Sequence, residues 1–340
     1  MMEKGKRNTN LDAMRVLACM AVVGLHTISN KRSAVEMCFY LVCGFAVPVF
    51  FMASGYTLLS RERVGYGYVA RKAGQLLGLA VGWHVLFWLL ELTADVLRGN
   101  FSLRWVAALP GEFFDSFFNR GWFSHLWYLW AAALVYACLP LLIRLRARLW
   151  HLFVALLCVG GALTLASCLM GEPLQRYCTQ TLRLWIWLKY FILGGLLAGA
   201  SPSPLLRLKR LSLRWHTALL AVLTLALIPC QYLLARDALH SPWAEYFYDG
   251  VFETLWITVL FTWVMKLPIP AKAAPCVRRL SSLTLGVYIT HGLLLKVITG
   301  FPVAHAPIFA CAALRFLTIL LLSALATWIL SRIPVLRRLV

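Results

Sequence analysis

The sequence predicts an all-α, polytopic integral membrane protein with about ten transmembrane helices. Three observations predict this fold. Hydrophobic residues make up 61% of the 340 residues, and the mean hydropathy is +0.76, whereas soluble domains contain roughly 45–50% apolar residues. The apolar residues form runs of about 20, the length that crosses a hydrocarbon layer ~30 Å thick. The basic residues lie mostly between these runs, as they do in the loops of membrane proteins.

Ten apolar runs are long enough to be spans, and we expect helices because a helix satisfies its own backbone in lipid. The predicted spans are 11–29, 37–60, 73–94, 126–145, 150–170, 185–200, 216–235, 250–267, 284–300 and 308–330. No internal repeat, low-complexity segment or linker interrupts the series. We therefore expect a single transmembrane domain over 1–340, without a soluble accessory domain.

The charges predict the orientation. With the N-terminus in the cytoplasm, most of the 33 Lys and Arg residues fall on the cytoplasmic side, while Glu112, Asp115, Glu245 and Asp249 fall in outer loops. This bias follows the positive-inside rule, and with ten spans it places both termini in the cytoplasm. The net charge of +20 is thereby explained by topology. The expected partner is the lipid bilayer, and a nucleic acid is not expected.

The longest outer loop, about residues 95–125, contains many aromatic residues. Two interpretations stay open: a surface helix that anchors at the membrane interface, and a cover over a substrate site. The ten cysteines lie mostly in apolar runs without C-x-x-C spacing, which favours packing over metal or redox chemistry. Cys168 and Cys178 flank an outer loop, and the sequence leaves open whether they are bridged. No metal site is expected.

The first predicted helix contains three ionisable residues, Asp12, Arg15 and His26. Such residues cost at least ~2.5–3.5 kcal/mol each at the centre of a span, so each is a candidate for function. Eleven steps of ~100° bring His26 to within about 20° of the face of Arg15, roughly 16 Å further along the helix. Asp12 is close enough to pair with Arg15. The alternative is a structural ion pair together with a packed histidine.

An Arg and a His separated by ten residues in the first helix is the signature of the membrane-bound acyltransferase-3 family, which this chain resembles. Four further stretches are similar to the family and occur in its order along nearly the whole chain. They are Val49–Tyr56, His125–Leu129, Tyr190–Gly195 and Leu285–His291.

The resemblance implies an O-acyltransferase, usually an acetyltransferase, of the bacterial plasma (inner) membrane. Its donor would be cytoplasmic acyl-CoA, such as acetyl-CoA, used as a co-substrate with no permanently bound cofactor. Its acceptor would be a hydroxyl of a cell-surface carbohydrate or related envelope molecule. The catalytic residues would be His26, Arg15 and Asp12. His26 would act as a general base or as a transient acyl carrier, and the sequence does not separate these roles.

The resemblance also indicates a place for the acyl-CoA phosphates at the start of the third predicted helix. Members commonly carry Arg-x-x-Arg there, whereas this chain has Lys72 and Gln75, with Arg71 beside them. Lys binds phosphate as a point charge but lacks the bidentate fork of Arg. Arg71, Lys72 and Gln75 are therefore the candidate donor site, and the alternative for the two cations is a purely topological role.

Substrate-binding candidates are His125 and Trp127 at the outer end of the fourth predicted helix, and Tyr288 and His291 on one face of the ninth. An interface anchor or a packed histidine is the alternative at each position. Lys189, Glu253 and Arg315 also fall in spans, and pairing between helices is expected for them. At the level of the whole chain, two alternatives remain. One is a secondary transporter with an Arg15–His26 proton relay, and the other is a regulatory membrane domain without catalysis.

Overall fold

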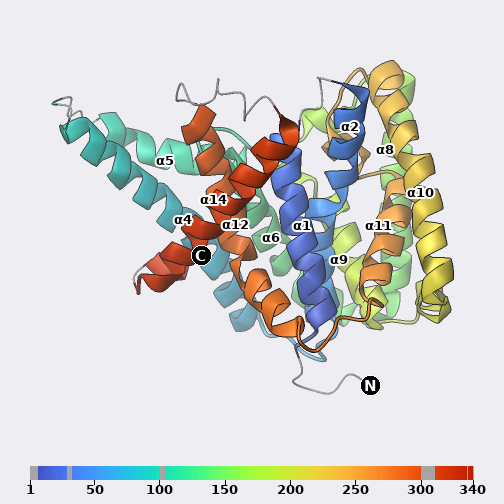
Figure 1. Cartoon of the computed structure of the whole chain (residues 1–340). Coiled ribbons are helices and arrows are strands. Elements are labelled where there is room, and N and C mark those ends of the chain that lie inside the picture. Colours follow the sequence, from blue (N-terminus) through green and yellow to red (C-terminus); the bar gives the residue numbers. More distant parts are fainter. Residues whose placement is uncertain are drawn as a thin grey trace.

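The computed structural model describes residues 7–28, 33–97, 99, 104–299, 311–334 and 336–339, and throughout these ranges its regular elements are helices, with no strand. The long helices stand side by side as a bundle, from which α4 and α5 project on one side (Figure 1). The principal helices are α1 Thr9–Thr27, α2 Ala34–Val42, α3 Ala46–Leu58, α4 Tyr66–Leu97, α5 Arg104–Phe117, α6 Trp127–Ala137, α7 Leu139–Arg144, α8 Leu149–Met170, α9 Leu184–Ala198, α10 Leu213–Leu233, α11 Val251–Val264, α12 Ala274–Thr299 and α14 Ala312–Arg332.

Each of the ten predicted segments contains at least one of these helices. Six helical segments of the described residues are long and apolar enough to cross a membrane, and α9 and α11 are shorter apolar helices. The six are Ala34–Leu58, Tyr66–Leu97, Arg146–Met170, Leu213–Ala238, Ala274–Ile298 and Ala312–Arg332. The count of ten spans and the cytoplasmic termini stay predictions. Residues 29, 300 and 308–310, at the ends of predicted spans, lie outside the described residues.

Several helices run past the predicted limits. Helix α4 begins at Tyr66 rather than 73, and α12 begins at Ala274 rather than 284. The extra turns hold polar and basic residues, which a search for apolar runs leaves out although they continue the helix. The predicted loop at 95–125 also contains a helix, α5, which packs against α4 and α6. Residues 98 and 100–103 of that loop are outside the described ranges.

The tightest helix contact joins α3 and α9. A Cβ added to Gly55 would lie 1.8 Å from the Phe191 carbonyl oxygen, and one added to Gly194 would lie 2.0 Å from the Met52 carbonyl oxygen. Small residues let helix backbones approach this closely in membranes. Two of the stretches that carry the family resemblance, Val49–Tyr56 and Tyr190–Gly195, therefore meet as a packing interface at the centre of the bundle.

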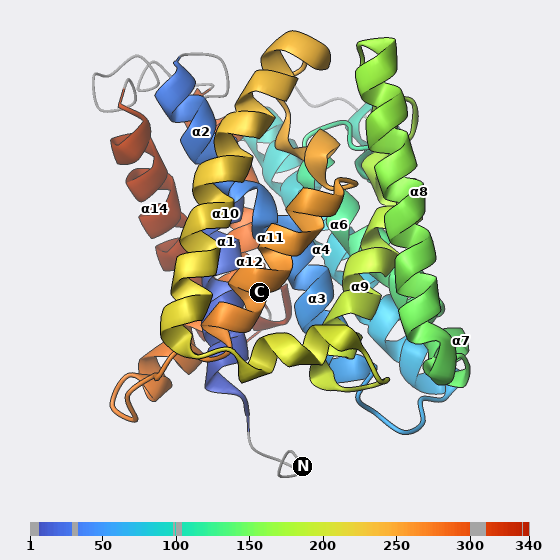
Figure 2. The same ribbon diagram turned by 90° about the vertical axis from the view of Figure 1, so that its right-hand side faces the viewer.

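Helix α1 lies inside the bundle and packs against α3, α12 and α14. In the view turned by 90°, α8 and α10 flank α9 and α11 (Figure 2). Asn8 caps the start of α1 by accepting a hydrogen bond from the Leu11 amide, and α8 and α9 end at Gly171 and Gly199 in the left-handed conformation. All ten cysteines are free, so Cys168 and Cys178 are not bridged.

Candidate active site

Two cavities in the bundle share part of their lining. The first, here called the histidine cavity, has a volume of about 210 Å³ and is lined by Val22, Leu25, His26, Tyr40, Val47, Asn119, Ser124, His125, Trp127, Tyr128, Gln180, Trp243, Ala244, Glu245, Tyr248 and Tyr288. The second, the arginine cavity, has a volume of about 200 Å³ and is lined by Arg15, Phe50, Ser54, Leu76, Tyr128, Ala132, Tyr136, Thr284, Leu285 and Tyr288. Tyr128 and Tyr288 line both cavities, with ring centroids 5.6 Å apart, and form the wall between them.

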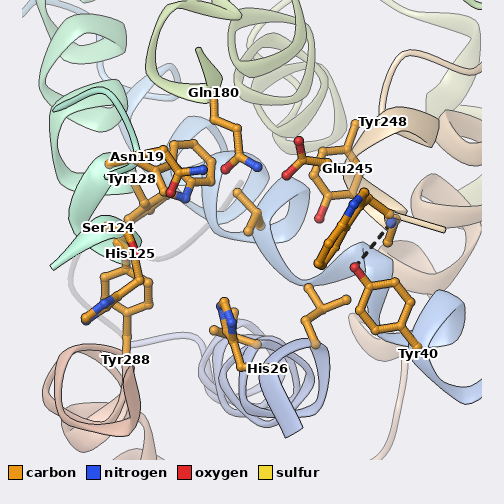
Figure 3. Close-up of a pocket in the computed structure, with 16 residues that line it drawn as sticks. His26, Tyr40, Asn119, Ser124, His125, Tyr128, Gln180, Glu245, Tyr248 and Tyr288 are labelled. Carbon is orange, nitrogen blue, oxygen red and sulfur yellow. Dashed lines mark hydrogen bonds between the residues drawn. The ribbon is translucent and has the colours of Figure 1, made fainter. Parts of the chain in front are cut away.

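His26 lies in the last turn of α1, and its imidazole points into the histidine cavity (Figure 3). The side chain is accessible there. Its ring centroid is 5.1 Å from that of His291, yet neither ring nitrogen of His26 is hydrogen-bonded to any residue that the structure describes. One nitrogen of a neutral imidazole is a proton acceptor, so His26 offers this cavity an uncommitted base.

His125 and His291 are held differently. His125 Nε2 is 3.0 Å from the Ile289 carbonyl oxygen, and His291 Nδ1 is 3.1 Å from the Val287 carbonyl oxygen. A carbonyl only accepts, so in each ring the nitrogen that faces the carbonyl carries the proton. His291 Nε2 is buried and has no partner in the described part of the chain. These two histidines are therefore oriented by the backbone of α12, whereas the ring nitrogens of His26 have no such partner among the described residues.

Local sequence explains how α12 holds His125. A Cβ added to Gly292 would lie 2.6 Å from His125 Nδ1, so only glycine leaves room for the ring at this point. The Tyr288 hydroxyl donates to the His125 carbonyl. Trp127, the remaining predicted substrate residue, lines the cavity and packs against Trp187 at a centroid distance of 5.2 Å. The structure thus brings His26, His125, Trp127, Tyr288 and His291 to one place.

The opposite end of α1 carries Arg15 and Asp12. Asp12 is fully buried and accepts hydrogen bonds from Arg7 at 2.6 Å and from Ser281 at 3.0 Å, besides the 3.4 Å ion pair with Arg15. With these partners Asp12 ties α1 to α12, and it lines neither of the two cavities described above. Arg15 is 32% exposed and lines the arginine cavity. The ion pair places Asp12 where it can orient Arg15.

The three candidate donor residues lie in the first turns of α4. Arg71 and Gln75 are exposed and Lys72 is half-buried, and none of their side chains is bonded to a residue within the described ranges. Lys72 precedes Leu76 by four residues, so the two share a face of α4, and Leu76 lines the arginine cavity. Lys72 is therefore one helical turn from a residue that lines that cavity, whereas Arg71 and Gln75 both lie to one side of this face, about 100° and 60° from Lys72 around the helix.

The histidine cavity is also lined by polar residues that the sequence does not single out as site residues: Tyr40, Asn119, Ser124, Tyr128, Gln180, Glu245 and Tyr248. They come from α2, from α6 and from the segments that connect the long helices, and no single spacing in the sequence links them. The charge of Glu245 predicts only that it lies in an outer loop. Its Oε1 atom accepts from Arg183 Nη1 at 3.2 Å. Burial raises the pKa of the Glu245 carboxyl, and the neighbouring guanidinium opposes that rise.

A buried cation supports this wall of the cavity. Lys189 of α9 is fully buried and donates to the carbonyl oxygens of Tyr248 at 2.8 Å and Asp249 at 3.2 Å. The Asp249 carboxylate accepts from Gln175 and Trp185, at 2.7 Å each. The segment that carries Glu245 and Tyr248 is thereby fixed to the core of the bundle. Among the described residues no group of three or more His, Cys, Asp or Glu side chains is arranged to hold a metal ion.

A family model described as an acyltransferase domain matches residues 8–332, nearly the whole chain. The chain belongs to the acyltransferase-3 family. Membership together with the apolar helices indicates a membrane acyltransferase. It also agrees with the resemblance inferred from Arg15, His26 and the four ordered stretches.

Two curated proteins, both amino-acid racemases of Enterococcus faecalis, are each 30% identical to parts of this chain. One match spans 142 residues, 41% of this chain and 20% of the relative, and the other spans 134 residues, 38% of this chain and 17% of the relative. The chain thus spans a fifth or less of the length of these relatives. No solved structure matches the chain.

Proposed function

We propose that the chain is a multi-pass O-acyltransferase of the cell membrane that moves an acyl group, in the first instance acetyl, from cytoplasmic acyl-CoA to a hydroxyl of a cell-envelope glycan. One observation carries the proposal. The cavity that holds the free imidazole of His26 and the cavity that holds Arg15 share a wall made of Tyr128 and Tyr288. Two substrates that enter from opposite ends would meet at this wall.

On the donor side, Lys72 and Arg71 bind the phosphates of acyl-CoA at the start of α4. The pantetheine arm then follows the face of α4 past Leu76 into the arginine cavity, where Arg15 is about one-third exposed. Lys and Arg are suited to this role because charge-assisted bonds to phosphate are roughly twice as strong as neutral ones. The thioester reaches the tyrosine wall from this side.

On the acceptor side, a hydroxyl enters the histidine cavity and donates a hydrogen bond to His26. As its oxygen attacks the thioester carbonyl carbon, His26 takes the proton. A C–O bond forms, the C–S bond breaks, and CoA leaves as a thiolate that receives the proton back from His26. His125 and His291, fixed by α12, keep the neighbouring walls in place. The acylated His26 of a covalent route would instead carry the group between two half-reactions.

The test uses the purified chain in liposomes with [14C]acetyl-CoA and an extracted envelope glycan. We expect CoA release and radiolabelled glycan that both depend on the glycan, and loss of the matching ester mass from the glycans of cells that lack the gene. A chain that releases no CoA with any envelope extract is not such an enzyme. To distinguish the general-base route from the covalent route, the protein is incubated with [14C]acetyl-CoA without acceptor and quenched with acid. Only the covalent route leaves radiolabel on the chain.

The transporter alternative gains no support from the family match. Uptake of labelled solute into the same liposomes, without thioester cleavage, would be the result that favours it.

A further inference from the structure

Three polar side chains, those of Asn119, Gln180 and Glu245, border the histidine cavity and determine which kind of ligand it can bind. Figure 3 shows Asn119, Gln180 and Glu245 around the space above His26, with their polar ends directed inward. The side-chain amides of Asn119 and Gln180 form no hydrogen bond to any described side chain or backbone group. The Gln180 side chain is nevertheless buried, with only 8% of its surface exposed. A buried amide such as that of Gln180 needs a partner. Asn119 is exposed, and both amides face the cavity.

Glu245 differs from the two amides because it is charged and held. Oε1 is bound by Arg183, a side chain only 4% exposed whose Nε donates to the Cys178 carbonyl at 3.0 Å. The Arg183 guanidinium is absent from the cavity lining, so a ligand meets the carboxylate and not the cation. Oε2 has no hydrogen-bond partner in the described ranges, and the side chain is 24% exposed. It is free to accept from a ligand.

No Lys or Arg is among the lining residues of the cavity, so no lining cation neutralises the Glu245 carboxylate. Lys296 lies near enough to His26 for their charges to interact, but its ammonium donates to the carbonyls of Gly121 and Trp122. The walls hold aromatic rings, among them Trp127, Trp243 and Tyr248. A ring with several hydroxyl groups can donate to the carboxylate, pair with the amides and pack against the aromatic faces. An anionic group would meet like charge at Glu245.

We infer that Glu245, positioned by Arg183, is the specificity-determining residue of the acceptor site and selects a neutral polyhydroxyl ring over an anionic one. The inference rests on the proposed function and names the chemistry of its acceptor. The volume of about 210 Å³ is below the roughly 300–1,000 Å³ of sites for drug-sized ligands. One ring of the acceptor therefore enters the cavity, and the rest stays outside.

The test measures binding without chemistry. Methyl glucoside and methyl glucuronide are titrated calorimetrically into the purified full chain in detergent, in the absence of acyl-CoA. We expect the neutral sugar to bind at least about tenfold more tightly than the anionic one. Glu245→Gln should weaken methyl glucoside binding by about tenfold or more, the value of one charge-assisted hydrogen bond, and should abolish most of the preference. Glu245→Asp, which keeps the charge, should retain the preference.

Glu172→Gln is the matched control, since Glu172 also pairs with an arginine, Arg176 at 2.7 Å, but lies outside the cavity. Thermal unfolding shows that each variant is folded. Equal affinities of folded wild type and Glu245→Gln for both sugars, or no binding of either sugar to wild type, would overturn the inference. If the sugars bind as expected but no acetyl group is transferred, the proposed function fails and the assignment of Glu245 stands.

Discussion

Two clusters of polar side chains lie close to the histidine cavity and differ in how their polar atoms are satisfied. The cluster around Lys189 is closed, because the ammonium donates to two backbone carbonyls and Asp249 accepts from Gln175 and Trp185. The histidine cluster is open, because His26 has no partner in the described part of the chain and His291 Nε2 is an unpaired buried acceptor.

This difference indicates which polar groups are available to bind or react with a substrate. An unsatisfied buried polar atom costs roughly 1–3 kcal/mol. The closed cluster avoids this cost and so contributes to stability, whereas the open cluster keeps polar atoms that another molecule can satisfy. Substitution in the open cluster should therefore reduce catalysis with little change in stability, while substitution in the closed cluster should do the reverse.

The largest effect is expected from His26→Gln. Glutamine keeps some hydrogen bonding and much of the volume but cannot transfer a proton, and a positioned general base contributes ~10²–10⁴-fold to the rate. We expect kcat to fall by this factor while the unfolding temperature and donor binding stay unchanged, as measured by acetyl transfer, thermal unfolding and CoA titration.

His151→Gln, on the exposed face of α8, is the control for the loss of a histidine. A His26→Gln protein that transfers acetyl at nearly the wild-type rate would show that His26 is structural. In that case His291 would become the candidate base.

The second effect falls on stability. Lys189→Met keeps the length of the side chain but leaves the carbonyls of Tyr248 and Asp249 without their buried donor. Removal of one partner from a buried charged network typically costs about 3–5 kcal/mol. We expect a clearly lower unfolding temperature and a kcat per folded molecule within about threefold of wild type.

Lys209→Met, in an exposed position, should leave both quantities unchanged. Normal stability of Lys189→Met with a lost kcat would contradict the division into a closed and an open cluster.

The sequence predicted more of the fold than of the site. Hydropathy located a helix in each of ten segments, because lipid requires long apolar helices, but it missed polar helical turns such as Tyr66–Lys72. The candidate residues on single helices, Arg15, His26 and His291, stand out in the sequence because an ionisable group in an apolar run is conspicuous. Gln180 and Glu245 do not stand out, since they lie in segments between the long helices, where polar residues are ordinary. Only the fold brings these loops against α1.

The glycines of the stretches that resemble the family also show how far the sequence alone predicts the role of a residue. Gly55 and Gly194 belong to stretches that resemble the family, and a motif alone does not say whether its residues pack or react. The structure shows backbone-to-backbone contact at both positions. Those two stretches therefore form the α3–α9 interface, and His26, the base of the proposed reaction, lies on α1.

The third effect concerns unpaired cations at the donor end. Arg71 and Lys72 have no partner among the described residues, in contrast to Lys189. Replacing both with Gln should raise the apparent KM for acetyl-CoA by at least about tenfold, since contacts to phosphate are worth ~1.5–3 kcal/mol each. The matched control is Arg207→Gln with Arg210→Gln, two exposed cations in another segment expected to be cytoplasmic. If both double variants have the wild-type KM, Arg71 and Lys72 serve topology alone.

The smallest effect is expected from Gln75→Arg, which restores the second arginine of the pair common in the family. Gln75 is exposed and directly precedes Leu76, which lines the arginine cavity. An added cation there can reach the phosphates of a donor already held by Lys72, but an exposed ion pair contributes only ~0.2–1 kcal/mol. We therefore expect the apparent KM for acetyl-CoA to fall by about two- to fivefold, with kcat unchanged. The gain should be smaller at high salt, because screening weakens exposed pairs. Gln75→Lys should give a smaller gain than Arg, since it lacks the bidentate fork. A KM that rises or stays constant in both variants would show that the donor phosphates lie elsewhere, even if His26 is the base.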